Sequence, residues 1–153
     1  ALYNNTFFLI YQLWWYSTMK IIRWILGQII LILDFLTSPK PVVRDTGAQA
    51  TLDQAMAKMS MYQFKTCPFC VKVRRELKRQ ALHIELRDAK GDAGHKATLV
   101  NEGGRHKVPC LRIEKADDSV QWLYESTDII TYLKELVTVV EANNLKNNDP
   151  SNA

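Results

Sequence analysis

A pair of cysteines stands between an apolar segment and an amphipathic one in residues 61–81, which read MYQFKTCPFCVKVRRELKRQA. The first four of these residues are typical of a short strand. After the cysteines, apolar residues recur at helical spacing with charged residues between them. Residues 82–86 then alternate between apolar and polar side chains and predict a second strand. The order strand, helix, strand indicates a βαβ unit whose first turn carries Cys67 and Cys70.

This position suits a thiolate nucleophile. Cys67 is expected at the N-terminus of the helix, where unpaired N–H groups and the helix dipole favour an anion. Pro68 fits the first helical turn, because no hydrogen bond is lost there. Cys70 would lie one turn further along, within reach of Cys67 but more buried. The spacing therefore predicts Cys67 as the attacking thiol and Cys70 as the resolving thiol.

Other uses of two closely spaced cysteines fit the sequence less well. A zinc site needs two further ligands at a similar spacing, but Cys110 and the three histidines are scattered. A covalent haem site needs His directly after the second cysteine, and Val71 stands there. The net charge of +4 on 153 residues does not by itself indicate nucleic acid. We therefore expect a redox site without a bound metal and without a nucleic-acid partner.

The second half of the chain predicts a helix, a strand pair and a last helix. Residues 91–103 carry small apolar side chains at helical spacing and end at two glycines. A strand at 108–113 is followed by an alternating partner strand at 120–124. Ser126 or Thr127 can cap the last helix, which has a continuous apolar face. The predicted order is β-α-β-α-β-β-α, which makes a mixed α/β domain.

Three motifs follow one another in an informative order. They are Cys67-Pro68-Phe69-Cys70, Lys107-Val108-Pro109 and Glu125-Ser126-Thr127-Asp128-Ile129. The first resembles the dithiol motif of the glutaredoxins, which usually has Tyr in place of Phe69, and the second resembles the Thr-Val-Pro of that family, whose proline is cis. The third is similar to the start of the last helix in glutathione transferases and transferase-like glutaredoxins. This resemblance implies a thioredoxin-like fold.

The resemblance also implies a glutathione site. The N–H and C=O of Val108, next to a cis Pro109, would pair with the cysteinyl part of glutathione like an added strand. The hydroxyl and N–H of Ser126 would bind the γ-glutamyl carboxylate at a helix N-terminus, and Glu125 would bind the γ-glutamyl ammonium. A plain helix cap at Ser126 and a plain surface carboxylate at Glu125 are the alternatives.

Further residues are implied around the same groove. Phe69 would form one of its walls. Lys65 or Lys107 would hold the glycine carboxylate of glutathione, although Lys107 stands where the family usually has Thr. Cys110 is expected to be a buried core thiol.

These features predict a glutathione-dependent thiol–disulfide oxidoreductase that reduces glutathione mixed disulfides or protein disulfides, with glutathione as co-substrate. Two alternatives remain open. Some glutaredoxins bind an iron–sulfur cluster between two subunits together with two glutathiones, but cluster binders usually lack the proline that stands here at Pro68. The second alternative is a thioredoxin-like membrane redox partner that does not use glutathione. Glu125 and Ser126 argue against this alternative.

The N-terminus differs from the rest in composition. Residues 1–36 are apolar and aromatic, and they predict a hydrophobic helix that anchors the protein to a membrane, with the redox domain facing the cytoplasm. A helix packed on the domain or on a partner, a cleaved signal peptide, and a soluble cytoplasmic protein remain alternatives. Residues 37–59 are expected to be a linker with a short helix near 52–58, before a glutaredoxin domain at 60–141 and a flexible tail at 142–153. The apolar leader is similar to that of some bacterial glutaredoxins.

Overall fold

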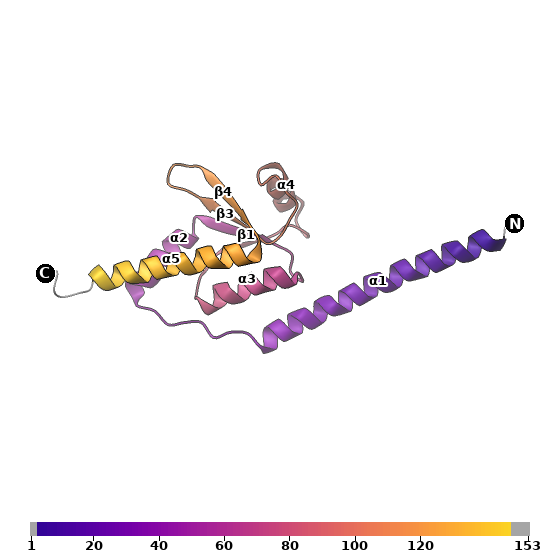
Figure 1. Ribbon diagram of the computed structural model, residues 1–153, viewed down its shortest axis with the longest axis horizontal. Coiled ribbons are helices and arrows are strands. Elements are labelled where there is room, and N and C mark those ends of the chain that lie inside the picture. The colour runs from indigo at the N-terminus through magenta and orange to yellow at the C-terminus, as the bar shows by residue number, and fades with distance from the viewer. Residues whose placement is uncertain (1–2, 148–153) are drawn as a thin grey trace. The chain divides into compact units, whose positions relative to one another are not determined.

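The computed structural model describes the backbone of residues 3–147 and the side chains of residues 18–147. The chain divides into two units, Ala1–Thr37 and Ser38–Ala153, and each is described by itself. Within the described residues, the first unit is the single helix α1 (Tyr3–Leu36) and the second combines a four-stranded sheet with four helices (Figure 1).

The sheet of the second unit has the strand order β2-β1-β3-β4. Strand β1 (Met59–Gln63) is parallel to β2 (Glu85–Asp88) and antiparallel to β3 (Cys110–Glu114), which in turn pairs antiparallel with β4 (Val120–Tyr124). A parallel pair needs a crossover connection, and helix α3 (Pro68–Arg79) lies within it. The predicted thioredoxin-like α/β fold class is confirmed.

Helices cover both faces of this sheet. Helices α2 (Thr46–Met56), α3 and α5 (Ser126–Asn147) contribute to the main hydrophobic core, together with β1 and β3. Helix α4 (Ala93–Asn101) contributes Leu99 to a second, smaller cluster. The sheet therefore lies between two layers of unequal thickness.

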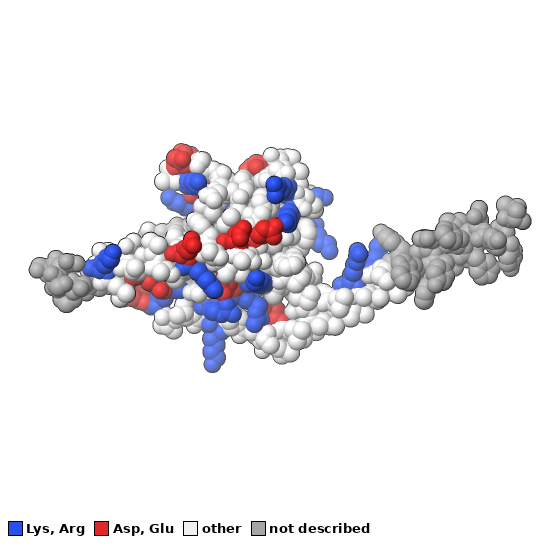
Figure 2. Space-filling model, viewed as in Figure 1, with Lys and Arg blue, Asp and Glu red and all other residues white. Residues whose placement is uncertain are grey.

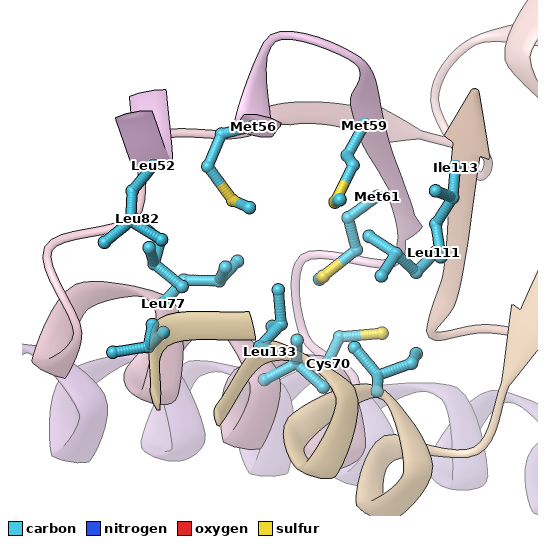
Figure 3. Packing of buried hydrophobic residues seen from close by; sticks show 13 residues of the cluster. Leu52, Met56, Met59, Met61, Cys70, Leu77, Leu82, Leu111, Ile113 and Leu133 are labelled. Carbon is cyan, nitrogen blue, oxygen red and sulfur yellow. The ribbon is translucent and has the colours of Figure 1, made fainter. Parts of the chain in front are cut away.

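Alternation along the strands assigns each side chain to one of the two layers. Met61 and Leu111, which are register partners, belong to the main core with Leu133 of α5 (Figure 3). The next pair, Tyr62 and Cys110, belongs to the cluster on the α4 side. Because all four strand residues are fully buried, a shift of one residue would exchange the two layers, so the register is strongly fixed.

The structure differs from the expected domain boundaries at both ends. Helix α2 begins at Thr46, inside the expected linker, and Asp45 caps it by accepting hydrogen bonds from the next N–H groups. Its Leu52 and Met56 are fully buried in the main core, which the mostly polar segment around them did not reveal. Helix α5 continues to Asn147, so the first half of the expected tail is helical, and residues 148–153 lie outside the described residues.

Helix α1 exposes many large apolar side chains. Those at least 43% exposed are Ile21, Ile22, Trp24, Ile25, Leu26, Ile29, Ile32, Leu33, Phe35 and Leu36. Within the part of the chain that the structure describes, no helix combines the length and the apolar character needed to cross a membrane. The membrane anchor expected at residues 1–36 stays a prediction.

Arg44 ties the extended segment before α2 to two helices. Its side chain is 4% exposed. Its Nε donates a hydrogen bond to Oε1 of Glu141 in α5 at 2.6 Å, and its Nη2 donates to Oε1 of Gln80 at 2.8 Å, just after α3. Its Nη1 also donates to the Gln80 carbonyl oxygen. A buried guanidinium with all these partners holds the segment in place.

We expect Arg44→Met to lower the free energy of unfolding by about 2 kcal/mol, because the Gln80 carbonyl and Glu141 lose a charged donor. Urea denaturation of the full chain measures this change. Lys40→Met, in the same extended segment but at an exposed position, is the matched control and should change stability by less than about 0.5 kcal/mol. Equal stability of the two variants would show that the Arg44 contacts do not stabilise the fold.

Candidate active site

The two cysteines of the dithiol motif occupy unlike positions at the start of α3. Cys67 is the N-cap residue of this 12-residue helix, and Pro68 occupies its first turn. The Cys67 side chain makes no capping hydrogen bond to the helix, so first-turn N–H groups stay available to an anion. Cys67 is partly exposed, whereas Cys70 is buried, and both are free thiols.

Burial is the main cause that raises the pKa of the Cys70 thiol, to about 12. The neighbouring Cys67 thiol adds a smaller rise. Cys70 is therefore protonated at neutral pH, and a protonated thiol does not attack a disulfide. The asymmetry between the two thiols favours Cys67 as the nucleophile.

Arg74 fixes the loop that leads into the thiol pair. It is one of the basic residues that gather over α3 (Figure 2), and these are Lys72, Arg74, Arg75, Lys78 and Arg79. Its Nη1 donates to Oε1 of Gln63 at 2.5 Å and its Nη2 donates to the Lys65 carbonyl oxygen at 2.9 Å. Its positive charge also opposes part of the rise in the pKa of Cys70. The sequence pattern placed Arg74 only among the charged residues between the apolar positions of the helix, and the fold shows its contacts with the loop.

A second piece of backbone lies next to the dithiol loop. The Val108–Pro109 peptide bond is cis and leads directly into β3. Because Tyr62 of β1 pairs with Cys110, the chain leaving β1 and the chain entering β3 run side by side. Among the described residues, no backbone hydrogen bond uses the N–H or C=O of Val108. This N–H and C=O can therefore pair with an extended ligand.

The junction between β4 and α5 supplies the third part of the site. Ser126, the first residue of α5, is only 7% exposed. The Ile129 N–H donates to the Glu125 carbonyl oxygen at 3.1 Å, so the three preceding N–H groups are the free donors of a helix N-terminus. Glu125 itself has a φ of 68°, in the left-handed region that is uncommon for a residue other than glycine.

The structure brings together two residues that the sequence analysis assigned to opposite ends of glutathione. The Lys107 ammonium and the Glu125 carboxylate form an ion pair with each other, and their side chains are 54% and 59% exposed. Lys65 is exposed as well, and its Nζ lies 3.8 Å from Oδ2 of Asp88. Of the two lysines considered for the glycine carboxylate, Lys107 thus already has an anionic partner in direct contact.

The remaining predicted residues lie around or behind these parts. Phe69, two residues after Cys67, is 62% exposed, and its role as a wall of a glutathione groove stays a prediction. Cys110 is fully buried, and burial raises the pKa of its thiol to about 11. Among the described side chains, no three His, Cys, Asp or Glu residues come together in a way that could hold a metal ion.

Part of the second unit is similar to known proteins. Residues 59–116 match the family model described as Glutaredoxin. Over 89 residues the chain is 34% identical to prostaglandin E synthase 2 of Mus musculus, and this alignment covers 58% of the chain but only 22% of the mouse protein. The matched family segment contains Cys67, Cys70 and Val108, whereas Glu125 and Ser126 lie beyond it.

The different burial of the three thiols predicts their reactivity. With iodoacetamide at pH 7.5, we expect one label per native chain, on Cys67, and three labels after denaturation. A pKa that rises from 9.0 to about 12 lowers the thiolate fraction of Cys70 by about 1000-fold at this pH, and its labelling should increase steadily as the pH is raised. Mass spectrometry of tryptic peptides identifies the labelled residue.

Cys67→Ser is the control and should take up no label in the native state. Rapid native labelling of Cys70 or Cys110 at neutral pH would contradict the burial described for these thiols.

Proposed function

We propose that this protein reduces glutathione mixed disulfides or protein disulfides with glutathione as co-substrate, because residues 59–116 match the model of the glutaredoxins, a family of thiol–disulfide oxidoreductases. The observation that carries this proposal is the position of Cys67. It is a partly exposed thiol at the N-terminus of α3, in the chain that leaves β1 and runs beside the chain that enters β3. The Val108 N–H and C=O in that second segment have no backbone partner among the described residues.

The reaction needs only thiol–disulfide exchange. The Cys67 thiolate attacks the glutathione sulfur of a mixed disulfide, the substrate's S–S bond breaks, and the substrate thiolate leaves and takes up a proton. Cys67 now carries glutathione in a mixed disulfide. The thiolate of a second glutathione attacks the bound glutathione sulfur, which releases glutathione disulfide and restores the Cys67 thiolate. One mixed disulfide and one free glutathione thus give one substrate thiol and one glutathione disulfide. One free glutathione thiol is therefore consumed for each mixed disulfide that is reduced.

Three features support glutathione as the ligand. The Val108 N–H and C=O can pair with the cysteinyl residue of glutathione in the manner of an added strand. The N-terminus of α5 at Ser126 offers free N–H donors and a positive dipole end to a carboxylate. Phe69 offers an exposed apolar wall beside Cys67. Lys65 is left as the cation for the glycine carboxylate.

The high pKa of Cys70 favours release by a second glutathione over release by Cys70. Attack by Cys70 on the Cys67 mixed disulfide requires the Cys70 thiolate, which is scarce at neutral pH when the pKa is about 12. The thiol of free glutathione is in solvent, so burial does not raise its pKa. We therefore expect the monothiol route to carry most of the turnover.

The test is turnover of a glutathione mixed disulfide by the full chain, with glutathione, glutathione reductase and NADPH, measured as NADPH consumption. We expect Cys67→Ser to lose at least about 1000-fold in rate, because the nucleophile is removed. We expect Cys70→Ser to keep a rate within about threefold of the unmodified protein. Cys110→Ser is the control for replacing a buried thiol outside the motif.

Other results would favour the other two functions. An inactive wild-type chain that responds to thioredoxin reductase and not to glutathione would indicate a thioredoxin-like partner. Cluster absorbance in protein purified without air would indicate an iron–sulfur protein. Complete inactivity of Cys70→Ser with an active wild type would show that the dithiol route dominates.

We further propose that α1 associates with a membrane surface and that the redox domain faces the cytoplasm. The support is the band of exposed apolar side chains on α1, together with Lys20 and Arg23 on the same helix. A cytoplasmic location suits the reaction, since the cytosolic glutathione pool is reducing.

Membrane fractionation of cells that express the full chain tests this proposal. We expect the wild type in the membrane fraction and the Ile25→Asp, Ile29→Asp double variant largely in the soluble fraction, because each buried charge is unfavourable in lipid. Val43→Asp, at a position 94% exposed outside α1, is the matched control and should stay with the wild type. A wild-type chain found entirely in the soluble fraction would overturn the proposal.

A further inference from the structure

The ion pair between Lys107 and Glu125 joins the two halves of the proposed glutathione site. Lys107 directly precedes Val108, whose N–H and C=O are the groups proposed for the cysteinyl residue, and Glu125 directly precedes Ser126, where α5 begins. Their charged groups are in direct contact, and more than half of each side chain is exposed. The pair therefore connects the segment before Val108 to the start of α5, and it is open to solvent.

The backbone of Glu125 indicates that this placement is specific. Three residues other than glycine have positive φ among the described ones, namely Ala81, Asp118 and Glu125. Ala81 follows α3 and Asp118 lies in the β3–β4 turn, so both occur in ordinary connections. Glu125 alone occurs at the proposed site, and an uncommon backbone conformation at a binding site is a recognised sign of a functional constraint. The conformation helps to determine where the Glu125 carboxylate points.

The chemistry of the ligand matches the pair. The γ-glutamyl residue of glutathione carries its ammonium and its carboxylate on one carbon atom. A ligand ammonium that contacts Glu125 therefore brings its own carboxylate close to the cation that Glu125 held before, and also close to the N-terminus of α5. Glu125 would exchange the Lys107 ammonium for the ligand ammonium, and Lys107 would exchange the Glu125 carboxylate for the ligand carboxylate.

This inference rests on the proposed function. We propose that Lys107 and Glu125 form a gate that exchanges its internal ion pair for the ammonium and carboxylate of an α-amino acid group, so that the site selects thiols and disulfides bearing that group. Lys107 then binds the γ-glutamyl carboxylate and not the glycine carboxylate. A thiol ligand that lacks the ammonium leaves Glu125 bound to Lys107 and gains neither contact.

The exchange has a signature that separates it from two independent contacts. Neutralising Lys107 alone removes one ligand contact but also frees Glu125 from its competitor, and neutralising Glu125 alone does the converse. Each single change is therefore nearly silent. Neutralising both residues removes both ligand contacts, but the internal ion pair can be removed only once. The loss of affinity in the double variant is therefore larger than the sum of the losses in the two single variants.

The experiment measures the dissociation constant of S-methylglutathione, which cannot react, by its protection of Cys67 from iodoacetamide in the full chain. We expect Lys107→Met and Glu125→Gln each to change this constant by less than about twofold. We expect the double variant to weaken binding by about two- to fivefold beyond the product of the single effects, which is the range for an exposed ion pair. The same neutralisations at Lys115 and Glu135, exposed residues of the β3–β4 turn and of α5, form the matched control.

A second ligand tests the ammonium contact directly. N-acetylated S-methylglutathione lacks the ammonium, so it should bind the wild type more weakly than S-methylglutathione does, and Glu125→Gln should bind the two ligands equally well. An additive double variant, or an acetyl group without effect in the wild type, would overturn the gate.

These failures are distinguishable from failure of the proposed function. If the wild type turns over a glutathione mixed disulfide while the double variant is additive, the function stands and the gate is wrong. If the wild type neither binds S-methylglutathione nor turns over the mixed disulfide, the glutathione site itself is wrong, and the gate with it.

Discussion

The burial of β1 on both faces is the constraint on which the rest of the structure depends. All five of its residues are buried, and it pairs with β2 on one edge and with β3 on the other. Met61 must point into the main core and Tyr62 to the α4 side, so the strand has no freedom to slip. The end of β1 is thereby fixed, and with it the loop that presents Cys67 at the start of α3.

The same fold gives two cysteines three positions apart opposite degrees of exposure. Cys67 caps a helix at the edge of the core and keeps contact with solvent, while Cys70 lies one turn inside and faces the core. Burial then holds Cys70 as a neutral thiol, and Arg74 reaches back from the same helix to the loop before Cys67. One helix thus determines both which thiol is exposed and how the loop in front of it is held.

The sequence predicted most of the fold because its signals are local. The short apolar run before the cysteines, the helical spacing after them and the alternation at residues 82–86 indicated the βαβ unit that β1, α3 and β2 form. Helix α2 was not placed correctly, because its three buried residues stand four apart in a polar segment and gain their partners only from the folded core. Its start at Asp45 depends on a single capping side chain.

For the site, the sequence by itself determined the chemistry: two thiols at a strand-to-helix turn, a proline before a strand, and a serine at the start of a helix. The tertiary structure alone decided which of these groups meet. Lys107 and Glu125 lie 18 residues apart and carry no periodic signal, yet the antiparallel pairing of β3 with β4 brings the two ends of that hairpin together. Charge contacts between residues distant in sequence follow from strand register and chain direction. Both are properties of the assembled sheet, so a local sequence pattern does not reveal these contacts.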